Sequence, residues 1–285
     1  MQKIYINSLS SICPPKGDAP DYKALIPNAN MRRRMGRMLK MGVASGLQCA
    51  SGVEVEAVIT TTGLGCLADT EKFLNEMLDN GGQMLNPTTF IHSTFNTLGG
   101  QLALLLHSNA YNMTYAQCGH SFENGLTDAV LLLGEGRRNV LLGGIDERID
   151  SGEVIEHRLG CLDGDAFRGE GAQFFLLDTA PTAASAAAIV DFSTFSGKMS
   201  REEVDEWIDR FLSDNGVVSD EVRLTACGGS CKVRGERMAF KEECGEYPTA
   251  VAYGLYRAAS ELSESYALVY NCYLDRYHSL ILLEK

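Results

Sequence analysis

Short apolar runs alternate with helix-spaced apolar residues through the first part of the chain. Runs rich in β-branched and aromatic residues predict strands over residues 1–7, 54–60, 111–117, 139–142 and 174–177. Apolar residues recurring every three or four positions predict helices over residues 31–49, 68–78, 95–107 and 121–133. We therefore expect a mixed α/β half that ends near residue 180.

A second strand-and-helix alternation follows the alanine-rich stretch 179–188. Strands are predicted over residues 188–194, 222–226, 266–270 and 278–283. Ser200 and Glu203 form a capping box that starts one helix, and Pro248 lies in the first turn of another that runs to residue 262. The predicted fold is α/β, with two related halves, 1–180 and an abbreviated 188–285, in a layered αβαβα arrangement whose two sheets sandwich helices.

Composition narrows the class of protein. The chain has 285 residues, of which 45% are hydrophobic, and a net charge of -12, which argues against nucleic acid binding. Its start lacks the pattern of a secretory signal, and no stretch approaches the roughly 20 apolar residues of a membrane span, so we expect a cytoplasmic protein without a membrane span. The nine cysteines suit reduced thiols. We expect no cofactor and no metal, and Cys227 with Cys231 is only a weak metal-binding pair.

Cys118 lies between a predicted strand and a predicted helix, at the apex of a sharp turn or one residue from it. A thiol at the start of a helix meets free backbone N–H groups and the positive end of the helix dipole, which stabilise a thiolate for attack on a thioester. The alternative is a buried and inert cysteine. His120 is near in sequence, but an ordinary capping or surface role is expected for it.

A glycine-rich turn offers a rival interpretation. Thr62-Gly63-Leu-Gly65 follows a predicted strand and approximates a dinucleotide-binding fingerprint. The required acidic residue about 20 positions later is replaced by Asn80-Gly81-Gly82, and no βαβ unit closes there. The sequence therefore disfavours nucleotide binding.

Several short motifs occur in an order that resembles one known family. They are Asn86-Pro87 with Phe95-Asn96 and Gly100-Gln101, the Cys118 turn, Val140-Leu-Leu-Gly-Gly-Ile-Asp-Glu147, Gly169-Glu-Gly-Ala172, Lys241-Glu-Glu-Cys-Gly-Glu-Tyr-Pro-Thr-Ala250 and Tyr277-His-Ser-Leu-Ile-Leu-Leu283. Together they resemble the β-ketoacyl synthases, in particular the synthase-like proteins of aryl-polyene and flexirubin-type pathways. The resemblance covers nearly the whole chain and implies a thiolase-like fold.

The resemblance fails at two catalytic positions. Condensing members use a Cys-His-His set, whereas this chain has Cys227 and Glu246 at the positions of the two histidines, while the family's lysine persists as Lys241. An enolate oxygen needs hydrogen-bond donors, but an ionised glutamate only accepts and a thiol donates weakly. Cys118 and Lys241 remain candidate catalytic residues, although an orienting role is expected for Lys241, and Phe122 is expected to fill part of an acyl tunnel.

The resemblance implies three functional hypotheses. The first is a non-condensing or chain-length-factor-like subunit of fatty-acid or polyketide biosynthesis. It would bind acyl chains or an acyl carrier protein, or pair with a competent synthase. The second is an active acyltransferase or 3-oxoacyl synthase that uses Cys118 with an altered base, and the third is a purely structural dimer, so catalysis stays open. A homodimer or heterodimer is implied because the strand before the nucleophile is the family's dimerisation edge. The basic cluster Arg32, Arg33, Arg34, Arg37 and Lys40 either receives an acidic carrier protein or is an ordinary solvated helix face.

Overall fold

The computed structural model describes residues 2–17, 20–160 and 167–285. Its ten strands form one sheet in the order β3-β2-β4-β5-β1-β6-β10-β9-β7-β8. The first five are β1 (Ile4–Ile12), β2 (Ala57–Thr61), β3 (Tyr111–Tyr115), β4 (Val140–Asp146) and β5 (Gly171–Asp178). The last five are β6 (Ala187–Ser196), β7 (Val222–Gly228), β8 (Glu236–Met238), β9 (Tyr266–Tyr273) and β10 (Tyr277–Glu284). Met1, which opened the first predicted strand, lies outside the described residues.

The two halves of the sheet repeat one topology. From the outer edge inward, the first half has the order β3, β2, β4, β5, β1, and the second has β8, β7, β9, β10, β6. In each half this is the third, second, fourth, fifth and first strand along the chain. Its second strand is parallel to the third and the fourth, and the remaining pairs are antiparallel. The prediction of two related halves is thereby confirmed. The two sheets are, however, continuous, because β1 and β6 pair antiparallel over Ile4–Ile6.

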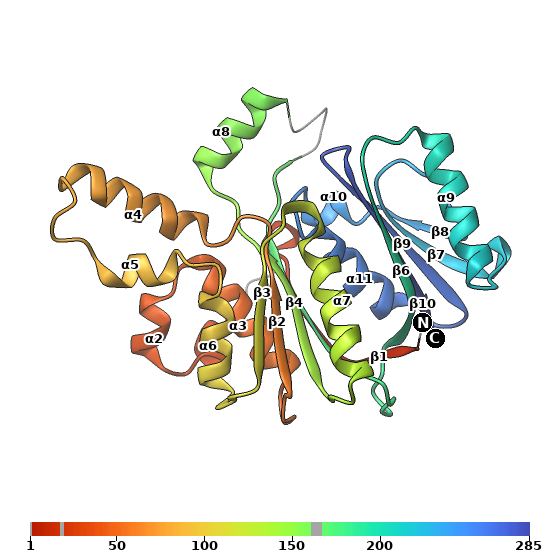
Figure 1. Cartoon of the computed structure of the whole chain (residues 1–285), viewed down its shortest axis with the longest axis horizontal. Helices are drawn as coiled ribbons and strands as arrows, with labels where there is room; N and C mark the ends of the chain where they lie inside the picture. The colour runs from red at the N-terminus through yellow and green to blue at the C-terminus, as the bar shows by residue number, and fades with distance from the viewer. Residues whose placement is uncertain (1, 18–19, 161–166) are drawn as a thin grey trace.

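Three apolar clusters give the layers that Figure 1 shows. The central cluster combines α7 (Ser121–Gly134) and α11 (Ala250–Glu261) with the inner faces of both half-sheets. A second cluster packs α3 (Arg37–Cys49) and α6 (Thr97–Leu105) on the outer face of the first half, and a third packs α9 (Arg201–Asp214) on the outer face of the second. The predicted αβαβα layering is confirmed.

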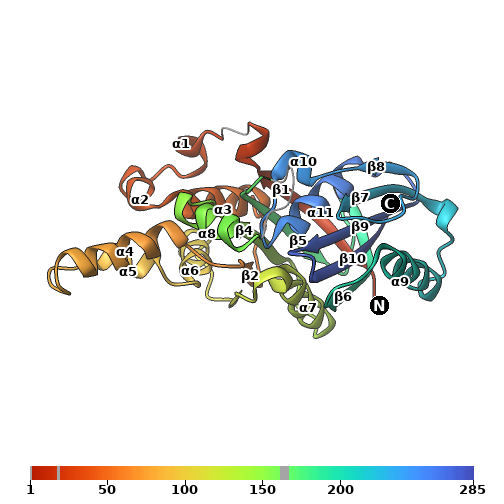
Figure 2. The ribbon, with the colours of Figure 1, turned by 90° about the horizontal axis from the view of Figure 1, so that it is seen from above.

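The remaining helices cap or extend these layers. They are α1 (Tyr22–Leu25), α2 (Ala29–Arg34), α4 (Leu67–Asp79), α5 (Pro87–His92), α8 (Asp150–Leu159) and α10 (Lys241–Cys244), with short 3-10 turns η1 (Pro14–Lys16), η2 (Cys118–His120) and η3 (Ser219–Glu221). Figures 1 and 2 show α4 and α5 projecting together from one end of the molecule. Among the described residues, no helix combines the length and the apolar character needed to cross a bilayer.

Two helix predictions need correction. The helix predicted over 31–49 is interrupted, because Met35 (ψ 132°) and Gly36 (ψ 175°) are extended and separate α2 from α3. Pro248 lies before Thr249, the N-cap of α11, and so is outside the first turn of that helix. The capping box of Ser200 and Glu203 at the start of α9 is confirmed.

Candidate functional site

Cys118 lies in the turn that joins β3 to α7. Its φ of +55° is in the left-handed region, which costs a residue other than glycine roughly 1–2 kcal/mol. Ser121 holds the turn, since its hydroxyl accepts a hydrogen bond from Gln117 N at 2.7 Å and donates one to Cys118 O at 2.9 Å. The predicted order of strand, sharp turn and helix is confirmed, with Cys118 at the strained position.

Gly119 is required by the close approach of β10 to this turn. A Cβ atom at Gly119 would lie 2.6 Å from Cγ of Tyr277, well inside van der Waals contact. The Tyr277 ring therefore covers the backbone beside the thiol. This contact joins the nucleophile turn of the first half to the last strand of the second half.

The raised pKa of the Cys118 thiol is what the alternative of a buried and inert cysteine would give. Burial raises the pKa of the half-buried thiol, and the charge of Asp146 adds to this. Hydrogen bonds from the Gly119 backbone and the Tyr277 side chain, together with the charge of Arg168, lower the pKa but do not offset burial. The predicted stabilisation of a thiolate by the start of the helix is therefore outweighed, and the thiol is protonated at neutral pH.

Two imidazoles lie near the turn but have other partners. His120 Nε2 is 3.2 Å from the carbonyl oxygen of His278, and the His120 ring meets Tyr277 edge-on with centroids 5.2 Å apart. His278 Nδ1 is 3.0 Å from the hydroxyl of Tyr270. Burial lowers the pKa of both imidazoles. Over residues 2–17, 20–160 and 167–285, no hydrogen bond links either ring to Cys118.

Lys241 and Glu246 form an ion pair. Lys241 Nζ donates to Glu246 Oε2 at 2.8 Å and Oε1 at 2.9 Å, and to the carbonyl oxygen of Cys272 at 2.6 Å. The Glu246 backbone pairs with the segment around Arg168, donating to Phe167 O at 2.8 Å and accepting from Gly169 N at 3.0 Å. These bonds fit the orienting role expected for Lys241, and they occupy the carboxylate of Glu246.

Cys227 is in a different layer from the Cys118 turn. Its side chain belongs to the outer cluster with α9, next to Cys231. The position that faces the central layer is the next one, Gly228, where a Cβ atom would lie 2.4 Å from Phe240 and 2.8 Å from Asn271 Oδ1. Sequence reasoning did not single out Gly228, because an absent side chain leaves no chemical signal.

Arg168 and Asp146 were also missed as parts of this site. The Arg168 guanidinium is buried, 3.1 Å from Glu156 Oε1 and 3.4 Å from the Tyr273 hydroxyl, and its charge acts on Cys118. Asp146 accepts hydrogen bonds at 2.8–3.0 Å from the Thr62 hydroxyl, Gly63 N, and both N and the hydroxyl of Thr249. Both residues lie in or beside quoted motifs, which was the available signal. The bonds to Asp146 also occupy the glycine-rich turn that approximated a nucleotide fingerprint.

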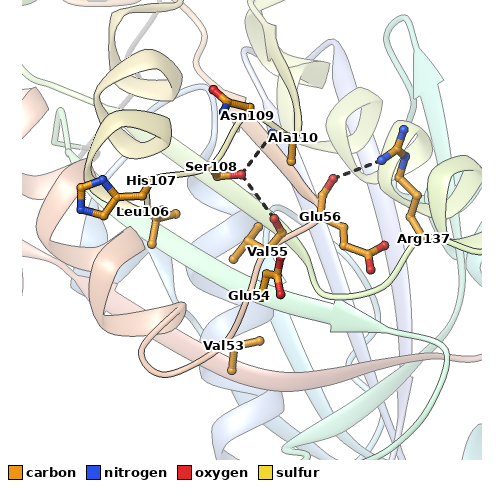
Figure 3. A pocket seen from close by; sticks show the side chains of 10 residues that line it. All are labelled: Val53, Glu54, Val55, Glu56, Leu106, His107, Ser108, Asn109, Ala110 and Arg137. Carbon is orange, nitrogen blue, oxygen red and sulfur yellow. Dashed lines mark hydrogen bonds between the residues drawn. The ribbon is translucent and has the colours of Figure 1, made fainter.

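The structure has a cavity beside Arg168, a groove along β3, and a further cavity at the amino ends of β2 and β3. Arg168 lines a cavity of about 430 Å³ together with Arg37, Arg148, Phe167 and Glu170. Figure 3 shows a cavity of about 260 Å³ at the opposite, amino ends of β2 and β3, lined by Glu56, Ser108 and Arg137 among others. Ser108 there donates to Val55 O at 3.4 Å, and Arg137 to Glu56 O at 3.4 Å. A shallow groove of about 850 Å³ follows β3 beside Phe95 and Met113.

Phe122, the residue expected to fill part of an acyl tunnel, is fully buried. Phe122 is 0% exposed and packs against Phe175 with ring centroids 5.8 Å apart. Beyond it, Gly144 leaves space for the ring, since a Cβ there would lie 3.0 Å from Phe122. Phe122 is therefore part of the packed central layer behind the Cys118 turn.

Comparison with solved structures identifies the architecture. "The ishigamide ketosynthase/chain length factor" matches with a TM-score of 0.80 at 16% identity, over 99% of each chain. The ketosynthase ApeO in complex with its chain length factor ApeC, from Xenorhabdus doucetiae, matches with 0.61 at 14% identity over 100% of both chains. AntDE:AntF, a type II acyl-carrier protein in complex with its ketosynthase, matches with 0.78 at 12% identity over 100% of this chain and 99% of the other. At these identities the likeness shows the fold.

Comparison by sequence adds the family. No curated protein matches this chain. The model of the β-ketoacyl synthase N-terminal domain matches residues 9–152, about half of the 285 residues, which include β2, β3, the Cys118 turn and β4. With that match and the shared fold, the chain belongs to the β-ketoacyl synthase family.

Proposed function

We propose that the chain is a non-condensing, chain-length-factor-like subunit of fatty-acid or aryl-polyene-type polyketide biosynthesis. It binds an acyl chain or an acyl carrier protein and pairs with a competent synthase. One observation carries the proposal: across the described residues, Cys118 has no imidazole hydrogen-bond partner.

Decarboxylative condensation needs donors aimed at a developing enolate oxygen. Removing one such donor from an enzyme costs about 10²–10³ in rate. Glu246 offers only acceptor oxygens, which Lys241 already occupies, and Cys227 lies in the outer layer. A chain with this arrangement supports binding better than it supports condensation.

The solved relatives support pairing and carrier binding. Two of them are described as a ketosynthase with a chain length factor, and a third as a ketosynthase with an acyl-carrier protein. This chain has an exposed apolar edge suited to such pairing. β3 is an edge strand, Met113 on it is 42% exposed, and Phe95 in the groove beside it is 53% exposed.

The basic cluster is only partly free for a carrier protein. Arg32 donates to the carbonyl oxygens of Ile26 and Pro27, and Arg37 pairs with Glu170 at 2.6 Å. Arg33 and Arg34 on α2 are exposed, and neither is in an ion pair among the described residues, although the Arg33 guanidinium donates to Asn30 Oδ1 at 2.7 Å. An acidic carrier protein would dock on these two charges, because the rest of the surface carries a net negative charge.

An active acyltransferase is the second candidate, and the Cys118 backbone favours it. A non-glycine residue in a strained conformation is commonly kept at a functional position. The Tyr277 side chain and the Gly119 amide both stabilise a thiolate there. Cys118 would then accept an acyl group from a thioester without condensing it.

Intact-mass measurement with an acyl carrier thioester separates the candidates. Our proposal predicts saturable carrier binding without a covalent adduct. It also predicts that Arg33→Glu with Arg34→Glu weakens binding at least roughly tenfold. An adduct that disappears in Cys118→Ala but persists in Cys272→Ala, another half-buried thiol, would establish the acyltransferase instead. Absence of binding altogether would leave a structural dimer.

A further inference from the structure

Two cysteines meet at the end of β7, outside the site described above. Cys227 is in the strand and Cys231 in the turn that follows, and their Sγ atoms are 3.3 Å apart. A disulfide bond measures about 2.05 Å, so the two sulfur atoms need to approach by little more than an ångström.

The chain around the pair permits this approach. Gly228, Gly229 and Ser230 separate the two cysteines, and Gly229 and Ser230 are exposed, so solvent lies over this part of the turn. Beyond Cys231 the chain is fixed to α9, because Lys232 N donates to Asp205 Oδ1 at 2.6 Å and Arg234 pairs with Asp209 at 2.5 Å. The turn is therefore held with both thiols facing the same apolar cluster.

The two thiols differ in acidity. A hydrogen bond from Cys231 is the main cause that lowers the pKa of Cys227, and the Gly229 backbone and Arg237 add to it. The same interaction raises the pKa of Cys231. Burial instead raises the pKa of Cys49 and of Cys66 to about 12. Cys227 is thus the more acidic thiol of the pair, although both side chains are buried, at 5% and 7% exposed, and Cys227 Sγ donates to Gly229 O at 2.9 Å.

We propose that Cys227 and Cys231 form a redox-active dithiol, oxidised to an intramolecular disulfide by a low-molecular-weight disulfide such as oxidised glutathione. The Cys227 thiolate attacks one glutathione sulfur, the external S–S bond breaks, and one glutathione leaves as a thiolate. Cys231 loses its proton to solvent and attacks the Cys227 sulfur, which releases the second glutathione. The two cysteines lose two electrons, and the external disulfide is reduced to two thiols.

Oxidation would fasten the turn to β7 on the outer side of the second half-sheet. Both sulfur atoms lie in the outer cluster with α9, whereas the helix that follows Cys118 packs in the central cluster. The dithiol is therefore independent of the function proposed above.

The test equilibrates the folded full-length chain with millimolar oxidised glutathione, followed by alkylation, intact-mass measurement and peptide mapping. We expect a loss of about 2 Da, the mass of two hydrogens, before alkylation, and after it seven alkyl groups (9 − 2) on the unfolded chain of nine cysteines, with one bond joining Cys227 and Cys231. Cys231→Ser should trap one glutathione on Cys227, because the resolving thiol is gone. Cys272→Ser, which removes the half-buried thiol packed against Gly229, should leave the disulfide intact.

Two results would overturn the proposal. In one, all nine cysteines of the wild-type chain stay open to alkylation after unfolding. In the other, the bond that forms joins any other pair. The wild-type measurement decides between these outcomes even when a variant fails to fold.

Discussion

At the scale of single residues, Cys118 combines backbone strain with a protonated, half-buried thiol. Ser121 and the covering Tyr277 ring maintain the left-handed turn, so the surrounding contacts offset its cost. Burial nevertheless keeps the thiol neutral, because no imidazole among the described residues takes its proton. The turn therefore combines a strained backbone with a neutral thiol.

A second titratable group lies on the helix that follows. Glu123 on α7 is fully buried, neither of its carboxyl oxygens has a hydrogen-bond partner in the described chain, and burial raises its pKa to about 7. The folded state therefore keeps a proton that the unfolded chain releases above pH 4.5. Stability contributed by the neutral form is present below pH 4.5 and is lost as the pH rises through 7, by about 3 kcal/mol in total.

Replacing this carboxyl tests that dependence. Glu123→Gln cannot ionise, so its free energy of unfolding should rise relative to wild type by about 2–3 kcal/mol between pH 4.5 and 7.5. Urea unfolding at several pH values measures the difference. Glu135→Gln, at the exposed end of the same helix, controls for loss of a negative charge. A difference between Glu123→Gln and wild type that stays constant with pH would contradict the assignment.

The order of elements around Cys118 could be predicted from sequence because its signal is local. The Cys118 turn was predicted because a strand, a cysteine and a helix are consecutive in the chain. Arg168 was missed because its partner Tyr273 is 105 residues away. The layer in which Cys227 lies could not be predicted from sequence either, because it depends on which face of β7 packs against α9.

At the scale of elements, the exposed edge of the sheet is the feature that bears on assembly. β3 leaves one side unpaired in the described chain, and the neighbouring arm of α4 and α5 carries apolar side chains in solvent, with Met84 between the two helices 96% exposed. Figure 2 shows this arm extending beyond the body of the molecule. Apolar surface beside an open strand edge is typical of an interface.

A charge on the edge strand should prevent pairing. We expect Met113→Lys to weaken association at least roughly tenfold, whether the partner is a second copy or a condensing synthase, because the ammonium would lose its water in the interface. Analytical ultracentrifugation of the chain alone and mixed with the synthase measures this. Val218→Lys, at an apolar residue 62% exposed in the other half, is the matched control. Equal association of both variants and wild type would exclude the β3 edge.

The long helices of the central and outer layers were predicted within a few residues of their observed bounds, and most of the missed elements are short. α8, which was not predicted, buries none of its side chains and has apolar residues only at Val154, Ile155 and Leu159. β8 is only three residues long. The break between α2 and α3 was missed because methionines continue at helical spacing through Met35, although the backbone there is extended.

At the scale of the whole molecule, the two halves meet around α7 and α11. Asp146 fixes this junction, because it binds the turn after β2 and the start of α11 together. The repeated strand order places the ends of β3 and β10 at one junction, where Cys118 and Tyr277 meet. The fold of a synthase is thus kept, while no imidazole among the described residues hydrogen-bonds to Cys118.

Release of CO₂ from a malonyl carrier thioester, with and without an acyl primer, tests this account most directly. For the chain without a partner synthase, we expect a rate equal to that of the carrier thioester alone, and the same rate for Cys118→Ala. Release well above that background, lost in Cys118→Ala and retained in Cys272→Ala, would show that condensation chemistry survives and would contradict the account.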